Sequence, residues 1–245
     1  MQDVFLQIIL GIYNTVAFHN LGLTIIVMAA LTRIVFYPFN KQQMIMSKKM
    51  AELTPHISAL KTKHKDNKQA FAQAQMDLYK QHGVNPAAGC LPSIVQIVVL
   101  FALLGAFNQI LSNKVSVDPL FLWWDLTKPD AYAVQNINFK IPGILVILAA
   151  LTQYIQTRMM MPIPPKVLKV DKPKEKEEKK EFAQEFAEAQ SSMMWMFPLM
   201  FLLFGTQWPA GLALYWSVSS ILAIIQQYKT QGLGGLEGVW NKMKK

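Results

Sequence analysis

Long apolar stretches separated by polar segments dominate the pattern of the chain. A helix needs roughly 20 mostly apolar residues to cross about 30 Å of hydrocarbon, because each residue advances it by about 1.5 Å. Several stretches reach or approach that length, and they predict an all-α, polytopic membrane protein with five transmembrane helices. The predicted spans are residues 22–37, 89–111, 141–158, 192–206 and 209–228.

The segment before the first span has the pattern of an amphipathic helix. Its apolar residues recur at helical spacing, at Phe5, Ile8, Ile9, Ile12 and Val16. Such a stripe suits a helix that lies in the membrane interface with its apolar face in the lipid. We therefore expect residues 1–21 to form an extracytoplasmic interfacial helix rather than a further span.

The polar segments between the spans differ in character. Residues 38–88 predict a cytoplasmic helical hairpin, two helices broken near His64 to Asn67. Residues 159–191 combine several prolines with dense mixed charge, which is typical of a flexible linker. Spans four and five are separated only by Thr206 to Pro209, which predicts a tight turn between them.

Composition and charge give the predicted bundle an orientation. The chain has 245 residues, of which 52% are hydrophobic and 16% charged, with a net charge of +9; soluble domains average nearer a quarter charged. Lysines crowd residues 38–88, 159–191 and the tail 229–245, whereas residues 112–140 carry few charges of either sign. Because cytoplasmic loops carry the positive excess, we expect the N-terminus outside and the C-terminus in the cytoplasm.

The sequence contains no motif that indicates a catalytic site. The single cysteine, Cys90, cannot form an internal disulfide, and the histidines are scattered without metal-ligand spacing. No nucleotide-binding or nucleophile motif is present. The first residues lack the basic region of a removable signal peptide, so none is expected. The sequence therefore predicts a protein that is not an enzyme and needs no metal or cofactor.

Arg33 is the most informative single residue, because it lies inside an apolar span. A mid-bilayer arginine costs about 2.5 to 3.5 kcal/mol on insertion scales, and more in simulations of a lone helix. One interpretation is that Arg33 extends its side chain to the cytoplasmic interface near Pro38 and Lys41. The other is that it serves a function. Since no predicted span contains aspartate or glutamate, its counter-charge would be water, lipid or a bound client.

Uncharged polar residues in the other spans could surround Arg33. Glutamines within a membrane span favour the interior of the bundle, where they meet donors and acceptors. Together these residues predict a hydrophilic groove, although ordinary hydrogen bonding between helices explains any one glutamine equally well. The predicted groove consists of Arg33, Gln96, Gln153, Gln156, Tyr215 and Trp216, and Ser217, Ser219 and Ser220 of the fifth span are further polar residues that could line it.

Several short motifs occur in a fixed order along the chain. They are YPF at 37–39 after Arg33, NPAAGCLP at 85–92 before Gln96, WWDL at 123–126, WPAGLALYW at 208–216 and IIQQ at 224–227. Each string alone is weak evidence, but the ordered set covers nearly the whole chain. This set resembles the landmarks of the YidC/Oxa/Alb family of membrane protein insertases.

The resemblance implies a five-span core with a hydrophilic groove that opens to the cytoplasm and the lipid but is closed to the outside. It implies that Arg33 receives the hydrophilic end of a client membrane protein in a bacterial plasma membrane. Gln96, Gln156, Tyr215 and Trp216 match polar or aromatic positions of the family, whereas Gln153 is inferred from its place one turn before Gln156.

The same resemblance suggests partners for the chain, and the sequence departs from the family pattern in some places. The implied partners are client membrane proteins as nascent chains and the lipid bilayer, with the ribosome and the general secretion channel as further candidates; no DNA is expected. Ala29 stands where some members have a hydroxyl, one turn before the arginine. A large periplasmic domain before the first span is absent, which suggests a minimal form or a trimmed core.

Two rival functions remain open on the sequence. A small transporter or channel could use Arg33 to bind an anionic solute, but it would need a route to the outside that the uncharged turn at 206–209 does not suggest. A structural assembly factor could shield helices without inserting them. Solute flux would distinguish the first, and insertion by the purified protein the second.

Overall fold

The computed structural model describes residues 2–64, 67–84, 91–111, 117–133, 140–160, 195–196 and 198–237. The main helices are α1 (Gln2–Thr15), α2 (Leu21–Val35), α3 (Tyr37–Glu52), α4 (Thr54–Lys63), α5 (Lys68–Gln81), α6 (Leu91–Leu111), α7 (Ile144–Met160) and α9 (Ala210–Gln231). An apolar helix, Pro198–Gln207, precedes α9 and ends in the 3₁₀ turn η3 (Gly205–Gln207); a second 3₁₀ turn, η4 (Gly234–Leu236), follows it. The strands are β1 (Leu120–Phe121), β2 (Trp124–Asp125), β3 (Ala131–Ala133) and β4 (Lys140–Pro142).

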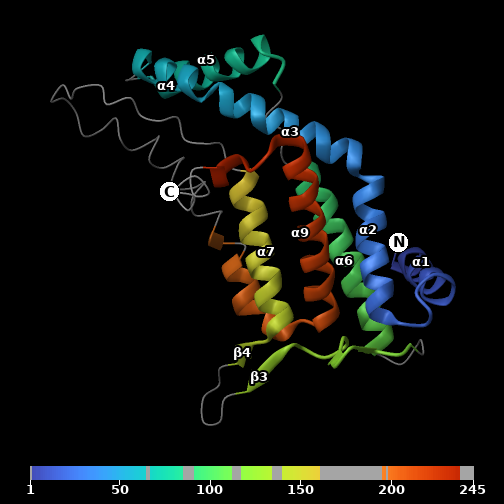
Figure 1. Cartoon of the computed structure of the whole chain (residues 1–245). Helices are drawn as coiled ribbons and strands as arrows, with labels where there is room; N and C mark the ends of the chain where they lie inside the picture. The colour runs from blue at the N-terminus through green and yellow to red at the C-terminus, as the bar shows by residue number, and fades with distance from the viewer. Residues whose placement is uncertain are drawn as a thin grey trace. The chain divides into compact units, whose positions relative to one another are not determined.

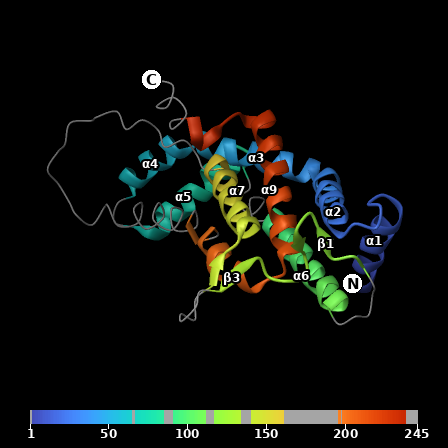
Figure 2. The ribbon, with the colours of Figure 1, turned by 60° about the horizontal axis from the view of Figure 1, so that its bottom comes forward.

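The chain divides into two compact units, and every predicted groove residue lies in the first. That unit consists of Met1–Pro38, Ser93–Gln156 and Trp195–Gln226, and the second contains the remaining segments. Within the first unit, α2, α6, α7 and α9 run alongside one another, and the strands lie at the end where α7 and α9 begin (Figure 1). Both views place α1 beside α2 (Figure 2).

Apolar side chains at helical spacing form the core of the first unit. On α6, Leu103, Ala106, Phe107 and Ile110 are buried, as expected for one face of a helix. The start of α9 packs tightly against that face, because a Cβ atom on Gly211 would overlap the ring of Phe107. Small residues that allow helices to approach closely are typical of packing inside membranes.

The outer face of the same helices is apolar as well. Ile34 of α2 is 68% exposed and Phe101 of α6 is 64% exposed. Further large apolar side chains are exposed along the helices of the unit, at Ile147, Leu151, Leu203, Phe204 and Ile225. A soluble protein rarely leaves so much apolar surface to water. The bundle is therefore suited to an apolar surrounding such as the interior of a bilayer.

The predicted count of five spans goes beyond what helix length and hydropathy establish here. Among the described residues, Ala210–Gln231 alone is long and apolar enough to cross a membrane, and Leu21–Val35 with Tyr37–Met50 qualifies when the pair is taken together. The remaining apolar helices in this part of the chain are shorter, for example Ile144–Met160. The five spans therefore stay a prediction.

The predicted interfacial segment contains α1, which covers Gln2–Thr15. One face of this helix, including Leu6, Ile9 and Ile12, is buried in the protein. Ile8 of the same helix is exposed, as is Val16, which directly follows the helix. The residues of the predicted apolar stripe therefore point partly into the protein core and partly away from it. The position of α1 in a membrane stays a prediction.

The predicted hairpin segment contains one more helix than the sequence suggested. The helix α4 ends at Lys63 and α5 begins at Lys68, on either side of the predicted break. The two helices contact each other. Asn67 caps α5, because its side chain accepts a hydrogen bond from the backbone N–H of Ala70 at 3.0 Å. An additional break falls at Leu53, where α4 begins with a proline in its first turn.

Two short antiparallel hairpins occupy the predicted extracytoplasmic loop, which an all-α assignment does not include. In the first, Phe121 of β1 pairs with Trp124 of β2. In the second, Tyr132 of β3 pairs with Ile141 of β4, so the third predicted span becomes helical three residues after its expected start at 141. Alternating short strands of two or three residues are too brief to be recognised from periodicity.

Candidate functional site

The polar contacts of the first unit centre on α9, which carries buried serines and aromatic residues between the neighbouring helices. Tyr215, Ser217, Ser219 and Ser220 are all buried. The hydroxyl of Ser217 donates back to the carbonyl of Ala213 in the same helix, at 2.8 Å. The other polar residues of α9 face α2 on one side and α7 on the other.

Arg33 lies in the last turn of α2 and is directed at α9. Its Nε donates a hydrogen bond to the backbone oxygen of Ser219 at 3.1 Å, one helical turn after Tyr215 on α9. A cation in the last turn of a helix is also favoured by the partial negative charge of the free carbonyl groups there. Within the described part of the chain, no ion pair is recorded for Arg33. Among the described residues, its positive charge is thus held by dipoles and not neutralised by a carboxylate.

Gln153 links α7 to α9 through a single amide oxygen. The indole Nε1 of Trp216 donates to Gln153 Oε1 at 2.8 Å, and the hydroxyl of Ser220 donates to the same oxygen at 3.3 Å. Residues 216 and 220 are one turn apart on α9, so both donors reach the same acceptor. We call this arrangement of Gln153, Trp216 and Ser220 the α7–α9 clasp.

A further polar contact lies on the side of α9 that faces α2. The amide of Gln226 donates to the backbone oxygen of Tyr37 at 3.5 Å, the long end of the hydrogen-bond range. Tyr215, Ser219 and Gln226 are spaced by four and seven residues and so share one helical stripe. From the sequence, Ser219 and Ser220 were further polar residues that could line the groove, whereas Gln226 was expected at the interface; its spacing from Tyr215 and Ser219 was the available signal.

The structure joins some of the predicted groove residues and leaves others apart. Arg33 bonds to α9 at Ser219, one helical turn after Tyr215, and Gln153 bonds to Trp216. Gln156 is half-buried on α7, and within the described residues no hydrogen bond is recorded for it. Gln96 lies on α6, but its side chain falls outside the described part. Its relation to Arg33, and with it the complete groove, therefore stays a prediction.

A small apolar cavity lies elsewhere in the first unit, between α1, α2 and α6. It is lined by Ile9, Leu21, Ile25, Leu103 and Phe107 among others. None of the predicted groove residues borders it. Among the described residues, no group of three or more His, Cys, Asp or Glu side chains is placed to hold a metal ion.

The loop at the opposite end of the bundle from Arg33 is bound tightly to the starts of α7 and α9. The backbone N–H groups of Ala210 and Gly211 donate to the carbonyl oxygens of Lys128 and Leu126, at 2.8 and 2.9 Å. Leu126 is fully buried beneath them. These bonds satisfy N–H groups that a helix start otherwise leaves free, and they fix the loop across that end.

Asp130 accepts hydrogen bonds from the backbone at the start of α7 in the same way. Its carboxylate accepts a hydrogen bond from the backbone N–H of Leu145 at 2.6 Å, and its backbone oxygen accepts one from Gly143 at 2.8 Å. The carboxylate lies so close to the backbone that a Cβ atom on Gly143 would overlap it. A negative charge at a helix start is favourable, so Asp130 is a capping residue.

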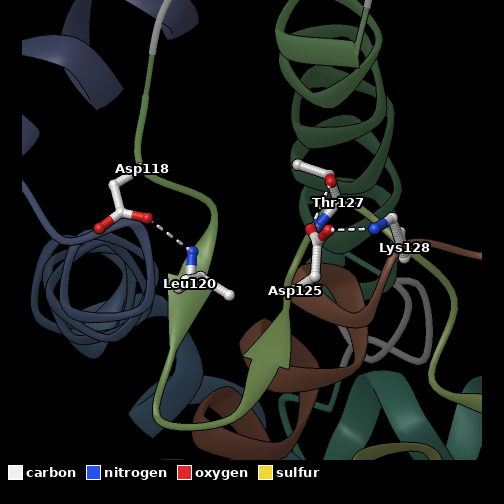
Figure 3. Close-up of polar contacts among 5 residues, drawn as sticks. All are labelled: Asp118, Leu120, Asp125, Thr127 and Lys128. Atoms are coloured by element: carbon white, nitrogen blue, oxygen red, sulfur yellow. Dashed lines mark hydrogen bonds and ion pairs between the residues drawn. The ribbon is translucent and has the colours of Figure 1, made fainter.

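The first hairpin of the loop is held by two further carboxylates, drawn in Figure 3. Asp118 accepts a hydrogen bond from the N–H of Leu120 at 3.0 Å. Asp125 accepts from the hydroxyl of Thr127 at 2.5 Å and forms an ion pair with Lys128 at 2.9 Å. Desolvation alone would raise the pKa of Asp125, but the bonds from Thr127 and Lys128 outweigh it and lower that pKa below its ordinary value.

Comparison with known proteins identifies a family. Residues 12–233 match the model of the 60Kd inner membrane protein family. The membrane protein insertase YidC of Fusobacterium nucleatum is 32% identical over 209 residues, which cover 85% of this chain and 85% of that protein. The membrane protein insertase MisCA of Bacillus subtilis is 31% identical, over 87% of this chain and 71% of that protein.

Other relatives are much longer than this chain. The membrane protein insertase YidC of Geobacter sulfurreducens is 32% identical over 85% of this chain, but the match covers only 33% of that protein. The chain therefore spans most of the shorter relatives and about a third of the longer one. The similarity extends over nearly all of the first unit, including the helices that carry Arg33, Gln153 and Trp216.

Proposed function

The chain belongs to the 60Kd inner membrane protein family, and from this premise we propose that it is a membrane protein insertase of the bacterial plasma membrane. The names of its relatives support insertion of membrane proteins as the activity. The site residues and the mechanism below are our proposal for this chain. They concern how a client's hydrophilic end enters the bundle and how its apolar segment leaves it.

The proposed mechanism rests on the contacts of the Arg33 side chain. Its guanidinium group is held by the carbonyl of Ser219, and no carboxylate among the described residues neutralises it. The hydrophilic or acidic end of a client can therefore supply the missing counter-charge. An arginine inside an apolar bundle is costly, and a site that binds a charged client recovers part of that cost when the client arrives.

The polar residues around α9 then lower the cost of bringing a hydrophilic segment into the bundle. An unpaired polar group loses several kcal/mol, on the order of 2 to 7, when it moves from water to an apolar medium. We propose that Arg33, Gln96, Gln156, Tyr215 and Trp216 line a hydrated groove that offers such a segment hydrogen bonds. Gln153 borders this groove and contributes mainly through the α7–α9 clasp.

The proposed groove opens on one side only. The loop that carries Leu126, Lys128 and Asp130 is bound across the starts of α7 and α9, which supports a closed extracytoplasmic end. The client would enter from the cytoplasm, and its apolar segment would pass between helices into the lipid. Outward movement of an acidic end is favoured by the membrane potential, by roughly 2.3 kcal/mol per charge per 100 mV.

The proposal includes the topology and partners that the sequence suggests. We propose five spans, with the N-terminus outside and the C-terminus in the cytoplasm, and with residues 38–88, 159–191 and 229–245 on the cytoplasmic side. Their lysines suit the anionic inner leaflet and ribosomal RNA equally. The clients are membrane proteins, and the ribosome and the general secretion channel are candidate partners.

Insertion by purified protein tests the function. Proteoliposomes with wild-type protein, with no protein and with Arg33→Ala are given a single-span client that has an acidic N-terminal end, and protease protection of that end is measured. We expect wild-type protein to protect it and Arg33→Ala to lose most of this protection. Arg158→Ala, which changes the chain's other arginine, is the matched control and should insert the client like the wild type.

Two results would decide against the proposal. Protection no better than in empty liposomes would exclude insertase activity, and full protection by Arg33→Ala would remove Arg33 from the mechanism. The rival transporter predicts a different signal, namely uptake of a small anion into the same liposomes without any client. Such uptake that is lost in Arg33→Ala would favour the transporter.

A further inference from the structure

Two strongly exposed apolar residues of the first unit lie outside its helices, at the tip of the hairpin formed by β1 and β2. Phe121 and Trp124 pair across the strands and pack toward the core. The two residues between them, Leu122 and Trp123, are 70% and 71% exposed. The hairpin thus turns one pair of apolar side chains inward and presents the next pair outward.

The backbone of this tip is strained by the residues it contains. Leu122 has a φ of +56°. The first position of such a two-residue turn favours glycine, asparagine or aspartate, because a branched side chain is crowded in the left-handed region. A leucine there is a local conflict, and such conflicts mark positions that are kept for function rather than for folding.

A second exposed apolar turn lies beside the first. Phe18, between α1 and α2, also has a positive φ, of +49°, and is 84% exposed. The side chain of Asn20 connects the two turns, since its Nδ2 donates to the carbonyl oxygen of Leu120 at 3.4 Å. The ring of Phe121 also lies against Gly22 at the start of α2, where a Cβ atom would overlap it. The two turns therefore form one feature at this end of the bundle.

We propose that Phe18, Leu122 and Trp123 form an interfacial anchor, seated at the boundary between lipid headgroups and acyl chains. Tryptophan is enriched at that depth, because its ring is apolar and its N–H can reach water. The carboxylates and Lys128 at the base of the hairpin provide the polar side of such a boundary. The anchor would hold this end of the bundle at a fixed depth.

The size of the patch favours lipid over a protein partner. A stable protein interface needs about 800 Å² from each partner, contributed by some 20 to 30 residues. A tip of three side chains supplies far less, even though a large aromatic residue buries about 150 to 250 Å². Lipid needs no such minimum, and the neighbouring Val16, which directly follows α1, is exposed as well.

Spin-label accessibility tests the anchor. In a Cys90→Ser background, single cysteines replace Phe18, Trp123 or Lys128, and each labelled protein is placed in liposomes of phosphatidylethanolamine and phosphatidylglycerol. Power saturation then compares collisions with oxygen, which concentrates in lipid, and with a water-soluble nickel chelate. Lys128 is the matched control, because it belongs to the same loop and its side chain is 77% exposed.

We expect oxygen collisions to exceed nickel collisions at positions 18 and 123 and the opposite at position 128. Nickel access at 18 and 123 equal to that at 128 would overturn the proposal. A label that neither reagent reaches would also overturn it, because that result means burial in a protein contact. Leu122→Asn keeps the left-handed turn but removes the apolar side chain, and it should raise nickel access at position 18.

Discussion

The α7–α9 clasp provides the sharpest test of how polar contacts hold the bundle together. In Gln153→Leu, a side chain of similar size loses the oxygen that accepts hydrogen bonds from Trp216 and Ser220. The Ser220 hydroxyl can turn to a carbonyl of its own helix, but the indole N–H of the buried Trp216 has no such alternative.

The expected loss of stability in Gln153→Leu follows from the donor groups that are left without an acceptor. A buried donor that loses its acceptor costs about 1 to 3 kcal/mol. Hydrogen bonds between membrane helices average about 0.6 kcal/mol and reach about 1.7, because the unfolded chain also finds partners. We therefore expect Gln153→Leu to lower the free energy of unfolding by about 1 to 2 kcal/mol.

A double-mutant cycle isolates the bond itself. Unfolding of Gln153→Leu, Trp216→Phe and the double variant is followed by circular dichroism in mixed detergent micelles with increasing dodecyl sulfate. Because Trp216→Phe removes the donor, the second substitution should cost less once the first is present, with a coupling of about 0.5 to 1.5 kcal/mol. Gln156→Leu, a half-buried glutamine on the same helix, serves as the control and should stay within about 0.5 kcal/mol of the wild type.

The clasp is refuted by either of two outcomes. The first is a Gln153→Leu protein as stable as the wild type. The second is additive effects of the two single substitutions, which would mean that Gln153 and Trp216 contribute independently. In both cases the contact between them would be incidental to the packing of α7 on α9.

The remaining predictions concern the loop between α6 and α7 and its contact with α2. Asp130→Ala removes the cap of α7 and should cost about 0.5 to 2 kcal/mol in the same unfolding assay, whereas Asp118→Ala, at an exposed position, should cost less; equal losses would contradict the capping role. The pKa of Asp125 is lowered in the folded protein, so its stabilising effect is present at neutral pH and is lost as the pH falls below about 4. The protection of residues 120–128 against hydrogen exchange, corrected for the intrinsic exchange rate at each pH, should therefore fall in acid more in the wild type than in Asp125→Asn, and identical responses would exclude the carboxylate. Gly22→Val should separate the hairpin from α2 by displacing Phe121, and unchanged exchange in the hairpin would show that the overlap is relieved at no cost.

Much of the helical framework could be predicted because apolar stretches have a length and a periodicity that sequence displays directly. The stretches around Arg33, Gln153 and Trp216 are helical in the structure, as α2, α7 and α9. The hairpins formed by β1 to β4 could not be predicted in the same way. Their strands are two or three residues long, and their register depends on contacts with the starts of α7 and α9.

Candidate site residues could be named from the sequence, but their contacts could not. A polar residue in an apolar span is visible in the sequence, and Arg33 and Gln153 were found on that basis. Their partners were not, because Arg33 uses the backbone oxygen of Ser219, which every residue possesses. Gln153 forms the kind of hydrogen bonds between helices that were the alternative explanation for each glutamine, since its amide oxygen is engaged by Trp216 and Ser220.

The central claim is that Arg33 lies in a wet groove that clients enter from the cytoplasm, and thiol labelling tests it most directly. In a Cys90→Ser background, single cysteines at Arg33, Gln96 and Gln156, with the buried Leu103 as the dry control, are exposed to a membrane-impermeant thiol reagent from each side. The account predicts labelling of the three groove positions from the cytoplasmic side alone. Labelling no greater than at Leu103 would contradict the groove, and labelling from both sides would indicate a channel.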